Sequence, residues 1–143
     1  MGVMSRARRF LLQARYAGEI NGAGLEENLA DLGAADRFHA EQIEWMTSLG
    51  RAVEVNRQRI ESLIEAKLHN WRLDRVSIVC RLIMEQAVAE AVYMRTPAAV
   101  VIDEALELAG AFEASASKSF VNGVLDAVLK DVTDQGQPTE QQC

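Results

Sequence analysis

A chain of 143 residues that is 49% hydrophobic and 25% charged has the size and composition of one globular domain, which excludes an intrinsically disordered protein. Its net charge of −6 is unevenly spread: residues 1–16 hold four arginines and no acid, so the rest carries −10, the total of −6 less this +4. A basic end on an acidic body predicts separate surfaces for separate partners and makes double-stranded DNA a poor candidate ligand.

The sequence predicts a cytoplasmic protein. It has no run of about 18 apolar residues that would span a membrane. The apolar run after the first arginines is too short for a signal peptide. Cys80 and Cys143 are too few and too far apart to form a disulfide framework, and a reducing compartment is the simplest interpretation.

The spacing of apolar residues predicts an all-α fold, because they recur at intervals of three and four and nowhere alternate with polar residues for long. Ser5, Thr96 and Ser117 are expected N-caps, with Pro97 as the first residue of its helix. One long helix is favoured over two helices broken at Gly50. Six helices are expected in this order, over residues 5–20, 25–32, 36–68, 74–94, 97–112 and 117–132.

The chain is expected to divide into flexible residues 1–4, a single helical domain over 5–132 and a disordered polar tail over 133–143. Phe112 continues an apolar stripe in its helix and is expected to be buried. In the last helix, Asn122 and Gly123 each cost about 0.5–1 kcal/mol against alanine. Because Gly123 has no Cβ, it would admit another backbone, which predicts a close helix crossing there.

Signals for catalysis and for metal binding are weak. His39 and His69 have no cysteine or acid at metal-ligand spacing. The sequence contains no glycine-rich phosphate loop and no nucleophile elbow. Cys80 lies among apolar residues and is expected to be a small core residue rather than a reactive thiol. We therefore expect neither an enzyme nor a bound metal or cofactor.

The N-terminal arginines are the best candidates for a binding site. On a helix, Arg6, Arg9, Gln13 and Tyr16 fall on one stripe at spacings of three, four and three. Arginines contact phosphates, a tyrosine ring stacks on an unpaired base, and a glutamine reaches base edges. A short single strand of RNA fits this stripe. The alternative is an exposed arginine-rich face without a ligand.

Four motifs resemble those of the NusB family of transcription antitermination factors. They are Arg6-Ala-Arg8 with Gln13-Ala and Tyr16, then Trp71-x-Leu-x-Arg75, then Pro97 followed by Ile102-Asp-Glu-Ala-Leu-Glu-Leu-Ala109, and Ser117-x-x-Phe120-Val-Asn-Gly-Val-Leu-Asp126. The last motif is the most specific, and the order of the motifs is kept along residues 5–132. The resemblance implies an all-helical protein of two packed antiparallel bundles, with about six to seven helices.

The resemblance also implies a function. Family members bind the boxA segment of ribosomal RNA operon leaders together with the small-subunit ribosomal protein that doubles as NusE, and the pair helps RNA polymerase to pass terminators. By match, the implied RNA-binding residues are Arg6, Arg8, Gln13, Tyr16, Ser117 and Phe120. Charge and position add Arg9 and Lys118 to this set. The NusE-type partner is expected on the helix predicted at 74–94, at Asp74, Arg75, Ile78 and Arg81. Some members also form homodimers that cover the arginine helix.

The sequence departs from the family pattern at four positions. Arg15 stands where the family prefers leucine, and Glu85 replaces an arginine. Cys80 and Ala116 each stand where an acid is common. These changes keep open a second interpretation, a paralogue that binds proteins without specific RNA. A third, the RNA-binding domain of a ribosomal RNA cytosine methyltransferase, would need a catalytic domain for which this chain has no room.

Overall fold

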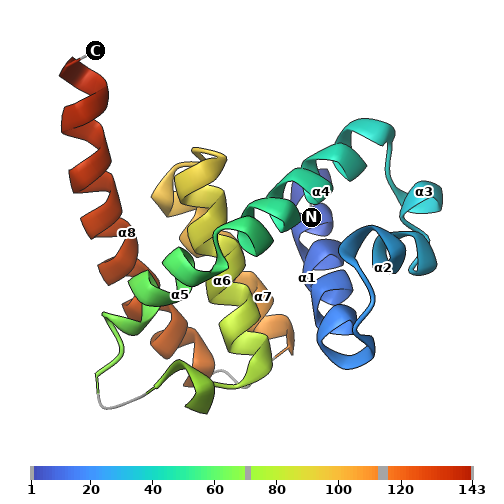
Figure 1. Cartoon of the computed structure of the whole chain (residues 1–143), viewed down its shortest axis with the longest axis horizontal. Coiled ribbons are helices and arrows are strands. Elements are labelled where there is room, and N and C mark those ends of the chain that lie inside the picture. Colours follow the sequence, from blue (N-terminus) through green and yellow to red (C-terminus); the bar gives the residue numbers. More distant parts are fainter. Residues whose placement is uncertain (1, 70–71, 113–115, 143) are drawn as a thin grey trace.

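The computed structural model describes residues 2–69, 72–112 and 116–142, and within these ranges every regular element is helical, as expected. Eight α-helices and one 3₁₀ turn (η1) follow one another in these residues (Figure 1). Their bounds are α1 Val3–Asn21, α2 Leu25–Asp31, α3 Ala34–Arg37, α4 Ala40–Val55, α5 Arg57–Glu65, η1 Leu73–Arg75, α6 Ile78–Tyr93, α7 Ala98–Phe112 and α8 Ala116–Gln142. None of the helices in the described ranges is long and apolar enough to cross a lipid bilayer.

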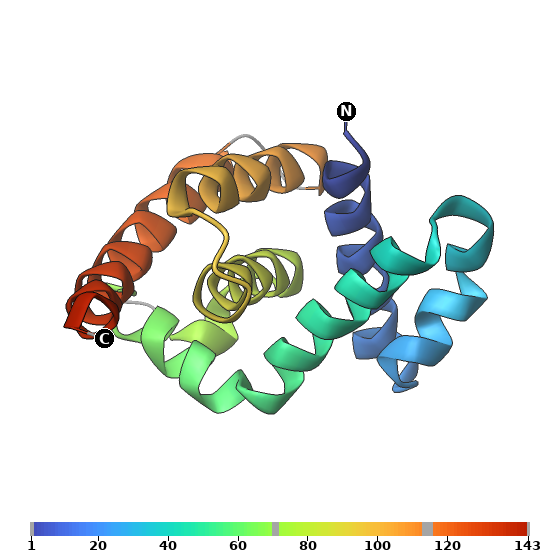
Figure 2. The same cartoon turned by 90° about the horizontal axis from the view of Figure 1, so that it is seen from above.

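Helix α6 lies at the centre of the fold, with other helices around it (Figure 2). It contacts α1, α4, α5, α7 and α8. Residues 82–90 of α6 are all buried, as expected for a helix packed on every side. Helices α1 to α4 form one packed group and α5 to α8 another, and α6 joins them through its contacts with α1 and α4. The fold is therefore organised so that polar groups of α6 must find partners in the interior.

Several predicted helix boundaries were wrong. Helix α1 begins at Val3, and Ser5 is not its cap but donates a hydrogen bond to Glu104 Oε1 at 2.6 Å. Helix α6 begins four residues later than predicted, because the Ser77 side chain caps it by accepting from the Cys80 N–H. Helix α7 begins at Ala98, one residue after Pro97. Helix α8 already includes Ser117, so Ser117 is not its N-cap.

The long helix predicted over residues 36–68 is three helices, and α4 ends at a break at Asn56 rather than at Gly50. Asn56 leaves helical geometry, with φ −109° and ψ 18°, and its side-chain amide donates to the carbonyl of Ala52 at 2.9 Å. Such a side-chain bond competes with the backbone for the same acceptor, which is why asparagine interrupts helices. The prediction also merged the short α3 with α4, whereas Phe38 and His39 between them are extended, with φ −135° and −75°.

Gly50 is a packing position. A Cβ placed on it would lie 2.2 Å from Leu25 Cδ2 and 3.4 Å from Leu11 Cδ1, so the glycine is what allows α2 to approach α4. We expect Gly50→Ala to lower the free energy of unfolding by about 1 kcal/mol, because the overpacking costs about 1–3 kcal/mol and the gain in helix propensity returns about 1. Urea unfolding at constant m-value measures the difference.

The control for this prediction is the same change made beside a shortened neighbour. In a Leu25→Ala background the side chain that the new methyl group meets is gone. Gly50→Ala should then stabilise the protein, since only the propensity gain remains. A destabilisation of equal size in both backgrounds would show that the contact with Leu25 is not the cause.

Helix α8 differs from its prediction in two ways. A Cβ on Gly123 would meet nothing within 4 Å, and Asn122 is exposed, so no close helix crossing occurs at this point in the described residues. Helix α8 also continues to Gln142, and its end projects past the other helices (Figure 1). The division of the chain at residues 5 and 132 stays a prediction.

Candidate nucleic-acid interface

The outer face of α1 carries the predicted row of polar and aromatic side chains. Arg6 and Gln13 are exposed, Arg9 is half-buried and Tyr16 is 41% exposed. We call these four residues the α1 row. None of them forms an ion pair with an acid in the described part of the chain. The two arginines of the row are therefore unpaired, although Arg9 also lines a hollow with Glu104 and Glu107 of α7.

Arg9 joins the α1 row to the end of α7. Its guanidinium carbon lies 5.6 Å from the centroid of the Phe112 ring, a cation–π distance. Its Nε is buried and is the one such side-chain nitrogen or oxygen without a hydrogen-bond partner in the described residues. Buried polar groups normally have partners. The Arg9 guanidinium is therefore held against α7 by its contact with Phe112 without a hydrogen bond from its Nε.

A hollow of about 330 Å³ lies between the α1 row and the first turn of α6. Gln13 and Tyr16 line it from α1, Val79 from α6 and Phe112 from α7. Phe112 is 39% exposed, so the prediction that it is buried was wrong: at the last residue of α7 it borders this hollow and lies against Arg9. Two partly exposed rings beside a free amide are what an unstacked base requires.

Arg8, in contrast, points inward. It is 8% exposed, and its Nε and Nη2 donate to the two carboxylate oxygens of Glu90 on α6 at 2.9 and 2.6 Å. Glu104 lies 3.5 Å from its Nη1, and the Trp45 ring lies 5.4 Å from its guanidinium carbon. The hydrogen bond to Glu90 raises the pKa of Arg8, so the charge is permanent. Arg8 holds α1 against α6 and does not belong to the α1 row.

Arg15 is also directed into the core, where it meets Glu85 of α6. Its Nη1 donates to the carbonyl of Leu82 at 2.7 Å, and its Nη2 donates to Glu85 Oε1 at 2.9 Å. Burial lowers the pKa of Arg15 to about 10, and the Glu85 carboxylate opposes that effect, so Arg15 is charged at neutral pH. Arg15 and Glu85, which we expected to depart from the family pattern, therefore pair with each other.

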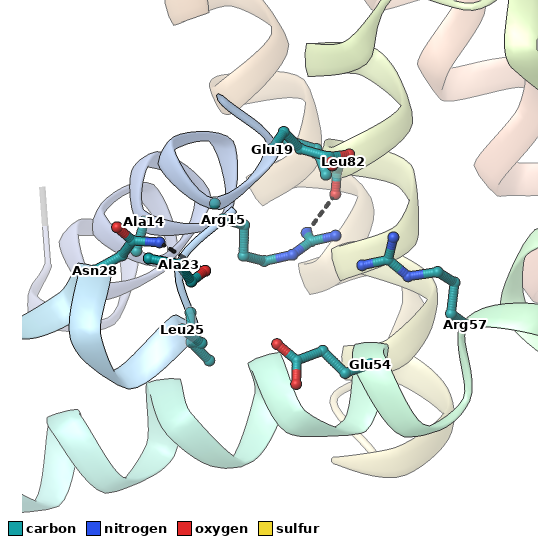
Figure 3. Close-up of a pocket in the computed structure, with 10 residues that line it drawn as sticks. Ala14, Arg15, Glu19, Ala23, Leu25, Asn28, Glu54, Arg57 and Leu82 are labelled. Atoms are coloured by element: carbon teal, nitrogen blue, oxygen red, sulfur yellow. Dashed lines mark hydrogen bonds between the residues drawn. The ribbon is translucent and has the colours of Figure 1, made fainter. Parts of the chain in front are cut away.

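A cavity of about 130 Å³ opens beside Arg15, between α1 and the junction of α4 with α5 (Figure 3). Glu54 and Arg57 point toward it from that junction, and Asn28 closes one side by donating to the carbonyl of Ala23 at 3.2 Å. The Arg15 guanidinium at its wall is already bonded to α6. We interpret this cavity as part of a polar seam between the two groups of helices, which contains Arg15, Glu19, Glu54 and Arg57.

Arg81 was predicted as a partner contact, but it also belongs to the polar seam. It pairs with Glu19 of α1, and its Nη1 lies 3.2 Å from Glu85 Oε2 and 3.9 Å from Glu61 Oε2. The side chain is only 18% exposed. Three carboxylates thus surround one guanidinium, and two of them, those of Glu61 and Glu85, interact with each other.

This crowding of carboxylates predicts that the stability of the fold depends on pH. A hydrogen bond with Glu85 raises the pKa of Glu61 to about 7, with burial and the charge of Glu85 adding to it and Arg57 and Arg81 opposing it. The folded state thus binds a proton that the unfolded chain releases near pH 4.5, the ordinary value of this carboxyl group. The stability that it contributes is full below that pH and is lost as the pH rises through about 7.

We expect Glu61→Gln to remove this loss. Because the side chain is 33% exposed, solvent limits the effect to at most about 1 kcal/mol. Unfolding free energies of both proteins, measured from pH 4.5 to 8, should diverge in favour of the variant toward the upper end. If the two curves of unfolding free energy against pH were parallel, Glu61 would not bind this proton in the folded state.

The predicted residues on α8 are less closely connected with the α1 row. Lys118 is exposed and its side chain lies over Gly110 of α7, where a Cβ would be 3.2 Å from Lys118 Cε. Ser117 is half-buried, and Phe120 is half-buried and packs against the core. In the described residues no hydrogen bond, ion pair or ring contact joins Ser117 or Phe120 to α1. Lys118 approaches the row only through α7.

The other predicted partner contacts form a small exposed patch before and at the start of α6. Asp74 and Arg75 are exposed on η1, where Asp74 pairs with Arg72 at 2.8 Å. Ile78 is 44% exposed on the first turn of α6, next to Val79, which lines the hollow beside Tyr16. A protein bound at Ile78 would therefore be a neighbour of a base bound at Tyr16. Trp71 of the second motif lies outside the described residues.

Sequence reasoning missed two kinds of residue. Phe112 and Arg37 border the α1 row, but Phe112, at the predicted end of α7, was expected to be buried, and Arg37 ends α3, which the prediction merged into one long helix. Glu85 and Glu90 are fully or almost fully buried, at 0% and 2% exposure. Acids within the long apolar run of α6 are a signal for buried cationic partners, because an unpaired buried charge is too costly.

The fold and the site define a helical protein with a basic, partly aromatic surface along its first helix. Comparison with known proteins agrees: the model of the NusB family matches residues 5–130. A protein of Anaeromyxobacter dehalogenans, named transcription antitermination protein NusB, is 36% identical over 125 residues, covering 87% of this chain and 88% of its own. One of the same name from Bacillus mycoides is 36% identical over 124 residues, covering 86% and 91%.

Solved structures give the same result. The NusB structure of T. maritima superposes with a TM-score of 0.83 at 29% identity, covering 91% of this chain and 92% of that one. A crystal structure of the antitermination factors NusB and NusE in complex with double-stranded RNA superposes with a TM-score of 0.79 at 22% identity, covering 91% and 99%, and shows the shared fold. This chain belongs to the NusB family.

Proposed function

We propose that this protein is a transcription antitermination factor that binds single-stranded, boxA-like RNA of ribosomal RNA operons together with a NusE-type ribosomal protein. The observation that carries the proposal is the α1 row, whose two arginines have no acidic partner and whose Tyr16 faces Phe112 across an apolar hollow. Family membership supports it, since curated relatives are named for antitermination. The action is that of a cytoplasmic binding protein within the RNA polymerase antitermination complex, without catalysis.

The chemistry of the α1 row suits a single strand better than a duplex. Arg6 and Arg9 supply charge for phosphates, while Tyr16 and Phe112 offer rings to a base that is not stacked in a helix. The body of the protein is acidic and would repel a duplex that extends beyond the row. Lys118 extends the basic surface, and we place Ser117 and Phe120 at its margin.

The patch formed by Asp74, Arg75 and Ile78 is the proposed site of the protein partner. An exposed isoleucine flanked by charges of both signs is a small apolar anchor with a polar rim. Because Ile78 neighbours Val79, the partner would close one side of the hollow beside Tyr16. RNA affinity should then be weak for the protein alone and higher with the partner. A homodimer that covers the α1 row is the alternative state to be tested by light scattering.

The test compares RNA sequences in the presence of the ribosomal partner. Gel shifts with a boxA-like RNA and with a scrambled RNA of the same composition should show preference for the boxA-like strand. Ile78→Asp should abolish the enhancement by the partner and leave the weak intrinsic affinity, since Ile78 does not line the hollow. Equal binding of both RNAs would contradict specific recognition and favour a paralogue that acts through protein contacts alone.

A further inference from the structure

A groove of about 400 Å³ lies on the other side of the α1 row, between α1 and α3. Arg6, Arg9, Phe10 and Gln13 line it from α1, and Arg37 and Phe38 from the end of α3. We propose that this groove is a second RNA subsite, in which Arg37 binds the backbone phosphate of a nucleotide that flanks the segment on the α1 row. The inference rests on the function proposed above and extends it.

The charge of the groove supports a phosphate ligand. Three guanidinium groups line it, and no acid is among its lining residues in the described chain. Arg37 is exposed and forms no ion pair there, although the chain outside residues 1–16 carries a charge of −10. Unneutralised arginines grouped at one groove bind phosphates through charge-assisted, paired hydrogen bonds. The cavity beside Arg15 lacks this property, because Glu19 and Glu54 line it.

The fold holds Arg37 in place. Gly33, at φ 87°, turns the chain from α2 into the four residues of α3, which ends at Phe38. The Phe38 ring meets the Phe10 ring edge to face, with centroids 5.2 Å apart and planes at 67°. The Arg37 guanidinium carbon then lies 5.8 Å from the centroid of Phe10. The Phe10 ring thus contacts both Phe38 and the Arg37 guanidinium, so binding costs less additional ordering of the Arg37 side chain.

The groove is continuous with the α1 row. Arg6, Arg9 and Gln13 belong to both, and Arg9 carries the buried Nε without a partner. A strand stacked between Tyr16 and Phe112 that follows α1 toward its N-terminus reaches Arg9 and Arg6 next, and Arg37 after them. This continuity is why we assign the groove to RNA rather than to a separate small anion.

The experiment is a thermodynamic cycle that measures RNA affinity while both the protein variant and the length of the RNA are changed. The shortest boxA-like RNA that binds is compared with the same RNA carrying extra nucleotides at its 5′ or its 3′ end. We expect the extension at one end to raise the affinity for the wild-type protein about tenfold, as for a charge-assisted contact. Arg37→Ala should abolish that gain, reduce the salt slope on the extended RNA by about 0.7, and leave the shortest RNA bound as before.

The matched control is Arg59→Ala, which removes the same charge from an exposed position on α5, well apart from the N-terminal half of α1 (Figure 2). It should keep the full gain. If neither extension raises the affinity, or if Arg37→Ala keeps the gain, the subsite is disproved while the α1 row stands. If the wild-type protein fails to bind even the boxA-like RNA with its partner present, the proposed function and the subsite fail together.

Discussion

Replacing Arg8 with methionine should lower the free energy of unfolding by about 3–5 kcal/mol, because it leaves the carboxylate of Glu90 buried without its partner. Glu90 is 2% exposed and receives both of the short Arg8 hydrogen bonds, at 2.9 and 2.6 Å. A stability of 5–15 kcal/mol is typical of a domain, so this one change removes a large share of it. Urea unfolding followed by circular dichroism measures the loss.

The matched control is the double variant Arg8→Met/Glu90→Met, which removes both buried charges and keeps similar volumes. Replacing a whole buried ion pair with apolar side chains is often neutral, so most of the lost stability should return. Glu104, which is partly exposed, can turn to solvent in this variant. If the double variant were as unstable as the sum of the single variants, the Arg8–Glu90 pair would not be the source of the loss.

Replacing Arg6, Arg9 and Tyr16 together with alanine should reduce RNA affinity at least about 100-fold. Loss of one stacked base costs about 1–3 kcal/mol, and each lost phosphate contact lowers the salt slope by about 0.7. The three side chains are exposed or half-buried and make no ion pair in the described residues, so the melting temperature should change little. Fluorescence anisotropy with a labelled boxA-like RNA measures the affinity and its salt slope, and thermal unfolding followed by circular dichroism measures the melting temperature.

Loss of net charge alone would weaken RNA binding somewhat, and the control must separate that effect. Arg51→Ala/Arg59→Ala removes two arginines from α4 and α5, where both are exposed. This variant should bind RNA within about twofold of the wild-type protein, since Arg51 already pairs with Glu26 and salt screens exposed charges that do not contact the RNA. A loss as large as that of the triple variant would mean that the α1 row has no special role.

The helical spacing of apolar residues predicted the fold class because burial of one face dominates helix packing, but it did not predict where helices end. The break at Asn56 depends on one side-chain hydrogen bond to Ala52, and the start of α6 on a cap from Ser77. Both are local bonds worth about 1 kcal/mol, too small to leave a mark on the apolar pattern. Gly123, which the sequence marked as a crossing, is simply exposed.

The candidate site was predicted in part for a similar reason. Spacing alone placed Arg6, Arg9, Gln13 and Tyr16 on one stripe, and the structure exposes most of that stripe. The resemblance added Arg8, which the structure buries against Glu90. Arg8 and Arg9 are one position apart, about 100° around the helix, so the partner on α6 decides which of them turns inward. No local pattern contains that partner, since Glu90 lies 82 residues away.

The central claim is that α1 divides its arginines between two tasks, with Arg6 and Arg9 binding RNA and Arg8 holding the fold. The most direct test is the salt dependence of RNA affinity for two folded variants, Arg6→Ala/Arg9→Ala and Arg8→Met/Glu90→Met. We predict that the slope falls by about 1.4 in the first, from two lost contacts of about 0.7 each, and is unchanged in the second. A folded Arg8→Met/Glu90→Met protein that loses RNA affinity, beside an Arg6→Ala/Arg9→Ala protein that keeps it, would contradict the claim.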